Sequence, residues 1–137
     1  MNPTGELADR AREFRCRVEA DAETIADARR GFGTWAAELT LGPEDRDDVV
    51  LATYEAMANS AEHAYRDQPA GGTVDVHATF VDNILTVTVS DHGTWKAPDQ
   101  ADTYRGRGLL MINGLADTSA ITERPEGGTV ITMTWRR

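Results

Sequence analysis

Two stretches, Asp91-His-Gly-Thr-Trp95 and Arg105-Gly-Arg-Gly-Leu-Leu-Met111, decide how the chain can fold around a ligand. An alternating apolar run typical of a β-strand precedes the first, and a helical apolar pattern begins at the end of the second. A carboxylate that ends a strand can accept a hydrogen bond from the amino group of a nucleotide base. Gly106 and Gly108 let backbone N–H groups approach phosphates at the positive end of a helix dipole. Together the stretches predict a nucleotide pocket, although Gly-x-Gly before a helix also occurs as a plain loop.

The length and composition indicate one globular domain. The 137 residues, 40% hydrophobic and 27% charged, are enough to bury a single core. We expect residues 1–12 to form a flexible leader and residues 13–137 to form the domain. No apolar run approaches the roughly 20 residues that a membrane span needs, and no secretory signal is visible at the start. Because Cys16 is the only cysteine, it cannot form an internal disulfide, and we expect a cytoplasmic protein.

The net charge of −9 argues against nucleic acid as a partner, since affinity for a phosphate backbone comes from Lys and Arg. An acidic protein that binds a polyphosphate needs backbone dipoles, local cations and a divalent metal. Between positions 96 and 107, three cations stand against two acids, which leaves a local net charge of +1: Lys96, Arg105 and Arg107 against Asp99 and Asp102. The electrostatics therefore imply Mg²⁺.

The first part of the chain predicts a strand and then a helix. Residues 13–19 alternate apolar and charged side chains, as a half-buried strand does. Asp21 then precedes a helical pattern with an apolar stripe at three- and four-residue steps. The stripe consists of Ile25, Ala28, Phe32, Trp35 and Leu39, and we expect its aromatic members to lie in the core.

A second helix is predicted from Pro43 to about Tyr65, because proline is favoured at the first helical position. Val50, Thr53, Met57 and Ala61 can face inward. On a neighbouring face, side chains at steps of four residues line up in one polar row, formed by Glu55, Asn59 and His63. The same row could equally be a solvated helix surface.

The rest of the chain predicts strands over 73–80 and 85–91, with Asp82-Asn83 as the tight turn between them. Residues 94–105 lack periodicity and form a loop, and the apolar residues of 109–115 mark a third helix. Two last strands, near 120–123 and 129–135, could pair as a hairpin beside the middle strand. The fold class predicted is an α/β (α+β) two-layer sandwich, with a mixed, mostly antiparallel sheet covered on one face by three helices.

Four motifs in this order resemble the boxes of the GHKL ATPases. Glu55-Ala-Met-Ala-Asn59-Ser-Ala-Glu-His63-Ala-Tyr65 is similar to their N-box, and Asp91-His-Gly93 to their adenine-binding box. Gly106-Arg-Gly-Leu109 resembles their glycine-rich box, and Gly127-Gly-Thr129 their last box. Within that superfamily the chain resembles the bacterial anti-sigma factor serine/threonine kinases.

The resemblance implies a Bergerat-type, histidine kinase-like ATPase fold and a function in partner switching. Such a protein sequesters a sigma factor and uses ATP to phosphorylate a serine of an anti-anti-sigma (STAS-type) antagonist. The resemblance also makes a homodimer plausible. No nucleic acid and no membrane is expected as a partner.

The chemistry of the candidate residues fits such a site. The side-chain oxygen of Asn59 is a hard ligand suited to Mg²⁺, and Glu55, one turn earlier, is placed to orient or deprotonate an attacking hydroxyl. Asp91 would read the adenine amino group, Gly93 would let the purine approach the backbone, and Thr129 would support Asp91. Phosphate contacts are expected from Arg105, Gly106, Arg107, Gly108 and Leu109, and His63 is expected to pack or hydrogen-bond near the phosphates.

Other interpretations stay open at this point. The chain could be a kinase-inactive module in which ATP only sets partner affinity, or an ATPase or histidine-kinase catalytic domain. The last is disfavoured because the chain has no helical hairpin with a phosphoacceptor histidine. A metal site from His63, His77 and His92 is not expected, since their spacing does not bring them together. Part of the acidic surface could dock a basic patch on a sigma factor.

Overall fold

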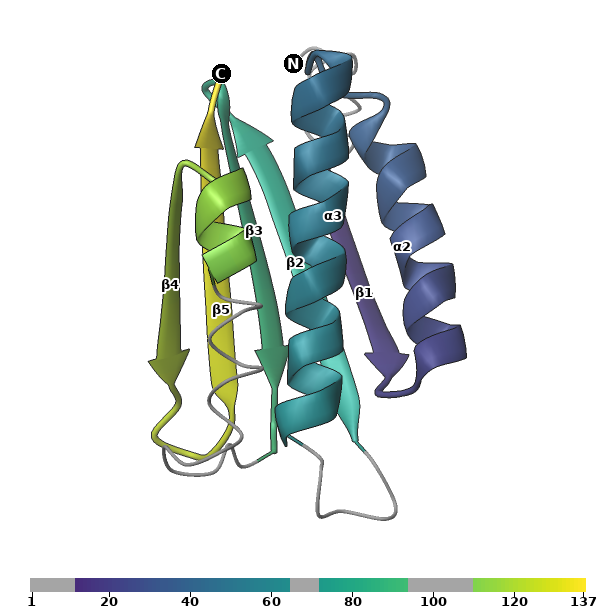
Figure 1. Ribbon diagram of the computed structural model, residues 1–137, viewed down its shortest axis with the longest axis vertical. Helices are drawn as coiled ribbons and strands as arrows, with labels where there is room; N and C mark the ends of the chain where they lie inside the picture. The colour runs from purple at the N-terminus through teal and green to yellow at the C-terminus, as the bar shows by residue number, and fades with distance from the viewer. Residues whose placement is uncertain (1–11, 65–71, 94–109) are drawn as a thin grey trace, which may run out of the picture.

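One sheet with helices on a single face forms the molecule, as the computed structural model shows (Figure 1). The structure describes residues 12–64, 72–93 and 110–137. The described strands form a five-stranded sheet of order β1-β2-β3-β5-β4, with every neighbouring pair antiparallel. The predicted two-layer sandwich is therefore confirmed, and the described part of the sheet holds no parallel pair. The strands are β1 (Glu13–Glu19), β2 (Thr73–Val81), β3 (Ile84–Asp91), β4 (Thr118–Glu123) and β5 (Thr129–Arg136).

Alternating side chains explain why these segments are strands. In β2, β3 and β5, every second side chain is buried beneath the helices, and the others lie on the opposite face. The predicted turn between β2 and β3 is confirmed, since Asp82 and Asn83 both have positive φ, at 53° and 64°. Two consecutive positive values are what a two-residue hairpin of type I′ requires. The predicted hairpin of β4 and β5 also forms, and β5 lies beside β3.

The first helix, α2 (Ala22–Ala36), begins where the sequence predicts. The carboxylate of Asp21 accepts a hydrogen bond from the backbone N–H of Thr24 at 2.8 Å, which caps the helix. The expectation that the helix continues to Leu39 is wrong. The N–H groups of Glu38 and Leu39 bond to carbonyls three residues back, so the chain tightens and leaves the helix after Ala36. Leu39 still packs against the core.

The second helix, α3 (Pro43–Asn59), continues as a π-helix, η1 (Ser60–Ala64), so the predicted helix is confirmed as far as Ala64, and Tyr65 lies outside the described residues. Thr53 and Met57 are buried as predicted, whereas Val50 and Ala61 are only half-buried. The buried arc of α3 is centred on small apolar residues that lie beside the predicted row. These fully buried residues are Val49, Ala52 and Ala56.

A helical segment over residues 110–115 confirms the third predicted helix within the described part of the chain. Ile112 is its fully buried member, while Leu110 and Met111 are exposed. The indole Nε1–H of Trp135 donates to the carbonyl of Leu115 at 2.8 Å, which ties this segment to β5. None of the described helices combines the length and the hydropathy that crossing a membrane requires.

Candidate functional site

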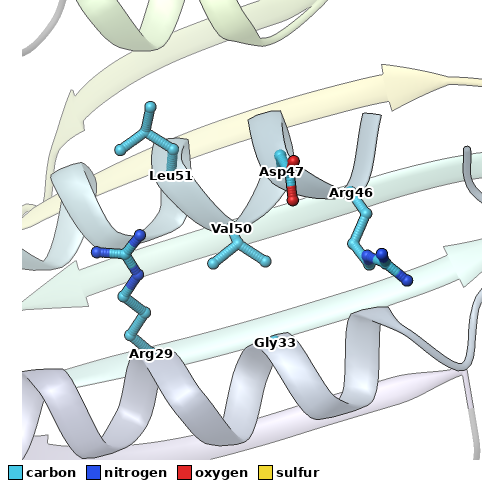
Figure 2. A pocket seen from close by; sticks show the side chains of 6 residues that line it. All are labelled: Arg29, Gly33, Arg46, Asp47, Val50 and Leu51. Carbon is cyan, nitrogen blue, oxygen red and sulfur yellow. The ribbon is translucent and has the colours of Figure 1, made fainter. Parts of the chain in front are cut away.

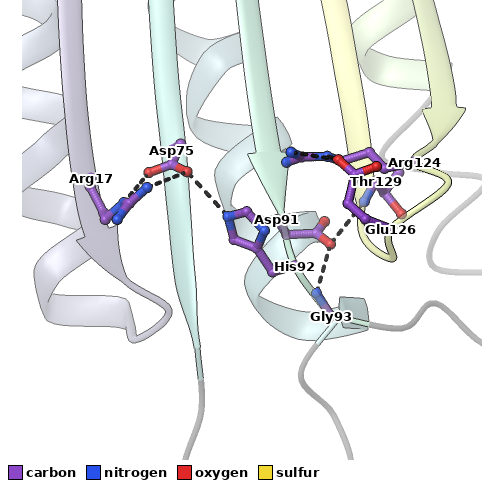
Figure 3. Close-up of polar contacts among 8 residues, drawn as sticks. All are labelled: Arg17, Asp75, Asp91, His92, Gly93, Arg124, Glu126 and Thr129. Atoms are coloured by element: carbon purple, nitrogen blue, oxygen red, sulfur yellow. Dashed lines mark hydrogen bonds and ion pairs between the residues drawn. The ribbon is translucent and has the colours of Figure 1, made fainter.

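Asp91 is a carboxylate at a position where the strand pattern calls for an apolar residue. Leu85, Val87, Val89 and Asp91 are the inward residues of β3, and all four are fully buried. The Oδ1 atom of Asp91 accepts hydrogen bonds from the backbone N–H of Gly93 at 3.2 Å and of Thr129 at 3.1 Å (Figure 3). Since a buried carboxylate is costly unless it is hydrogen-bonded, these two donors stabilise it at the end of the sheet.

The turn before β5 approaches Asp91 closely, and Gly128 makes this possible. Its φ is +105°, and a Cβ at this position would lie 2.1 Å from the carbonyl oxygen of Asp91. Arg124 donates its N–H to the carbonyl of Gly128 at 2.9 Å, which closes the turn. Gly128 belongs to the motif that resembles the last GHKL box, and a Gly-Gly pair before a strand is a signal for positive φ.

The end of α3 supplies a second part of the site. Asn59 is only 7% exposed, and its amide nitrogen has no hydrogen-bond partner in the structure. Glu55 lies one helical turn earlier and is half-buried. The interpretation of this row as solvated surface is therefore wrong for Asn59. Because η1 contacts both β3 and β2, this end of the helix lies against the strand that carries Asp91 (Figure 1).

Two further buried hydroxyls in α3 and η1 also have no hydrogen-bond partner. They are the Oγ1 of Thr53 and the Oγ of Ser60, and both residues are fully buried. Ser60 follows Asn59 directly, at the first position of the π-helix. Buried polar atoms are almost always paired, so these two are exceptions in the described core. The sequence held no signal for Ser60.

Asn59 fits the role of a magnesium ligand. Its side chain is buried at the end of α3, and a carboxamide oxygen is the hard donor that Mg²⁺ accepts. Among the described residues there is no cluster of three or more His, Cys, Asp or Glu side chains that could hold a metal. Mg²⁺ is ordinarily bound by one or two protein ligands together with substrate phosphates, so a single asparagine is compatible with such a site.

Several predicted site residues lie outside the described residues. The side chain of His63 is not among those described. The phosphate-binding stretch also lies outside the described residues: Arg105, Gly106, Arg107, Gly108 and Leu109.

A groove of about 370 Å³ lies between α2 and α3, away from Asp91 (Figure 2). It involves the first half of α3, whereas Asn59 is at the other end of that helix. None of the groove's polar side chains is buried. Nothing among them marks the groove as a binding site. The lining residues are Arg29, Gly33, Arg46, Asp47, Val50 and Leu51.

Known proteins resemble this chain over nearly its whole length. Residues 18–135 match the histidine kinase-like ATPase domain. The anti-sigma F factor of Clostridium acetobutylicum is 30% identical over 125 residues, which cover 83% of this chain and 86% of that protein. The serine-protein kinase RsbW of Staphylococcus aureus is 25% identical over 133 residues, which cover 86% and 82%.

A solved structure shares the fold. The crystal structure of the RsbU and RsbW domains of Rv1364c from Mycobacterium tuberculosis superposes with a TM-score of 0.72 at 25% identity. The match covers 90% of this chain but 32% of that chain, so this chain spans about a third of it. The described sheet and helices therefore have the architecture found in that structure.

Proposed function

Since the chain belongs to the histidine kinase-like ATPase domain family, we propose that it is an ATP-dependent protein-serine kinase and anti-sigma factor. Its substrate would be a serine of a STAS-type anti-anti-sigma protein, and its other partner a sigma factor. The names of the relatives, anti-sigma F factor and serine-protein kinase RsbW, support both halves of the proposal. A cytoplasmic location belongs to the same proposal.

The geometry around Asp91 is the observation that carries the proposal. A fully buried carboxylate whose Oδ1 is held by two backbone N–H groups is fixed in place at the end of the sheet. A fixed acceptor of this kind suits the amino group of adenine. Thr129 supports Asp91 by donating its backbone N–H to the Asp91 carboxylate.

Asn59 and Glu55 would provide the chemistry at the other end of the nucleotide. Asn59 would hold Mg²⁺, and the metal, when bound, would neutralise phosphate charge. Glu55 would accept the proton of the attacking serine hydroxyl. In that step the serine oxygen forms a bond to the γ-phosphorus, and the bond from the γ-phosphorus to the bridging oxygen of ADP breaks. The phosphate contacts are proposed for Arg105 to Leu109, with His63 nearby.

The experiment mixes the purified protein with Mg-ATP and a candidate anti-anti-sigma partner and measures phosphoserine on the partner. We expect transfer by the wild type, loss of transfer in Glu55→Gln with retained nucleotide binding, and loss of binding in Asp91→Asn. Glu44→Gln is the control, because Glu44 is an exposed glutamate in the first turn of the same helix. Full transfer by Glu55→Gln would contradict the role of Glu55.

Binding without transfer is the outcome that separates the proposal from its main alternative. If the wild type binds ATP and captures a sigma factor but forms no phosphoserine, the chain is a nucleotide-dependent binding module. If it binds no adenine nucleotide, the assignment of Asp91 fails as well.

A further inference from the structure

A row of charged side chains crosses the uncovered face of the sheet at the end where Asp91 lies (Figure 3). Arg17 in β1 bonds to Asp75 in β2, with Nε 2.6 Å from Oδ1 and a terminal nitrogen 3.3 Å from Oδ2. The Oδ2 atom of Asp75 also lies 3.4 Å from Nε2 of His92. On the far side, Arg124 pairs with Glu126 at 3.0 Å.

The register of the strands places Asp75 to hold His92. Asp75 pairs directly with Arg17 across β1 and β2, and with Ser90 across β2 and β3. His92 is two residues beyond Ser90, so it is a diagonal neighbour on the same face. The Arg17 guanidinium lowers the pKa of Asp75, with a smaller contribution from His92, so Asp75 stays a carboxylate at neutral pH. A fixed negative charge therefore faces the imidazole.

The backbone of His92 is part of the candidate site. It lies between Asp91, whose carboxylate is buried, and Gly93, whose N–H holds that carboxylate at 3.2 Å. A Cβ on Gly128 would lie 3.0 Å from the Cα of His92, so the turn before β5 packs on this residue. The imidazole is thus anchored on the open face while the adjacent carboxylate points into the core.

We infer that His92, held by Asp75, is a positioning residue that orients the Asp91–Gly93 turn for nucleotide binding, an inference that rests on the function proposed above. This contact ties the turn to β2, and through Asp75 to Arg17 in β1. Removing either His92 or Asp75 therefore leaves the turn free to shift at the end of β3 and weakens nucleotide binding.

Solvent limits how much this contact contributes. The side chain of His92 is 46% exposed and that of Asp75 is 29% exposed, so water screens the interaction and keeps its effect on affinity modest.

The test measures the dissociation constant of Mg-ADP by calorimetry for the wild type, His92→Gln, Asp75→Asn and the double variant. We expect each single variant to bind about two- to fivefold more weakly than the wild type. Because the two side chains act through one contact, the double variant should bind about as weakly as a single variant. Two independent structural losses would instead add.

His77→Gln is the matched control. His77 pairs with Glu13 at 3.3 Å on the same face of the sheet, at similar exposure, but it is not next to Asp91. It should bind Mg-ADP as the wild type does. Unchanged affinity in His92→Gln and Asp75→Asn, an equal loss in His77→Gln, or additive losses in the double variant would overturn the inference while leaving the proposed function intact. Failure of the wild type to bind Mg-ADP would overturn both.

Discussion

Replacing Gly128 with alanine tests how closely the turn before β5 must approach Asp91. A Cβ on Gly128 would lie 2.1 Å from the carbonyl oxygen of Asp91, and the φ of Gly128 is +105°. Gly127 is a matched control, because its φ is +99° but nothing outside its chain neighbours lies within 4 Å of a Cβ there. Both alanine variants carry the backbone strain, but only Gly128→Ala carries the collision.

The two contributions can be estimated separately. A side chain at a sparsely populated positive φ costs about 1–3 kcal/mol of unfolding free energy, and this applies to both variants. The atom that collides with the new Cβ at position 128 belongs to the backbone, so relieving the collision requires a shift of β3 or of the turn. This shift costs about a further 1–3 kcal/mol. Gly128→Ala should therefore lose about 2–6 kcal/mol in total.

Urea unfolding followed by circular dichroism measures the stability difference, and calorimetry with Mg-ADP measures its effect on the site. A shift of the Asp91 backbone disturbs the bonds that hold its carboxylate. Losing one hydrogen bond to a charged group costs about 1.5–3 kcal/mol, so Gly128→Ala should bind at least about tenfold more weakly. Gly127→Ala should bind as the wild type does, despite its lower stability.

Equal losses of stability in the two variants would refute the reasoning, because they would show that the turn relaxes away from Asp91 without cost. Unchanged nucleotide affinity in a folded Gly128→Ala would refute the link between this contact and the site. If Gly128→Ala does not fold, Gly128→Ser is no substitute, since serine carries the same Cβ. In that case a Gly127→Ala variant that folds and binds Mg-ADP as the wild type does still shows that the requirement for glycine is stricter at position 128.

Three further changes test the rest of the structure. Gly33→Ala should raise the free energy of unfolding in urea by about 0.5–1 kcal/mol, because glycine weakens a helix and the new Cβ would make an ordinary 3.9 Å contact with Val50. A loss of stability would mean that α2 and α3 pack too closely at this position to accept a methyl group. Arg137→Ala should cost up to about 1 kcal/mol at low salt and less at 1 M NaCl, because Arg137 bridges Asp45 at 3.0 Å and Asp117 at 2.7 Å. Arg136→Ala is the control, because the side chain of Arg136 forms no ion pair with a described residue, and equal losses in the two variants would contradict a contribution from the bridge. The N–H of Arg136 and the side chain of Arg137 lower the pKa of Asp117 in the folded protein. Its stabilising contribution is therefore present above the unfolded-state pKa of about 3.9 and is lost as pH falls through the lower folded-state pKa. Asp117→Asn should lose less unfolding free energy between pH 5 and pH 2.5 than the wild type, and an equal loss in the two proteins would contradict this.

Most of the fold could be predicted from local patterns. The alternation in residues 73–80, 85–91 and 129–135 depends only on neighbours in the chain, and so do the Asp82-Asn83 turn and the helix start at Pro43. The helix ends were less predictable. The tightening after Ala36 and the π-helix from Ser60 arise from hydrogen bonds that apolar periodicity does not encode.

The candidate site could be predicted only in part, because periodicity reports which residues share a face but not what that face contacts. Periodicity showed that Glu55 and Asn59 share a row, but not whether that row faces the sheet. Several small alanines along α3 leave little contrast between its faces, so the burial of Asn59 became visible only with the sheet in place. The contacts of Asp91 with Thr129 and of Asp75 with His92 depend on strand order and register, which bring distant residues together.

The separation of the donors around Asp91 along the chain has a consequence for how the protein folds. β2 with β3, and β4 with β5, are local hairpins, whereas Thr129 reaches Asp91 across 38 residues when the two hairpins dock. Closing that long segment has an entropic cost that the hairpins themselves do not carry. We therefore expect the surroundings of Asp91 to form after the two hairpins. On that order of events, a ligand bound there would slow the unfolding rate and leave the folding rate almost unchanged.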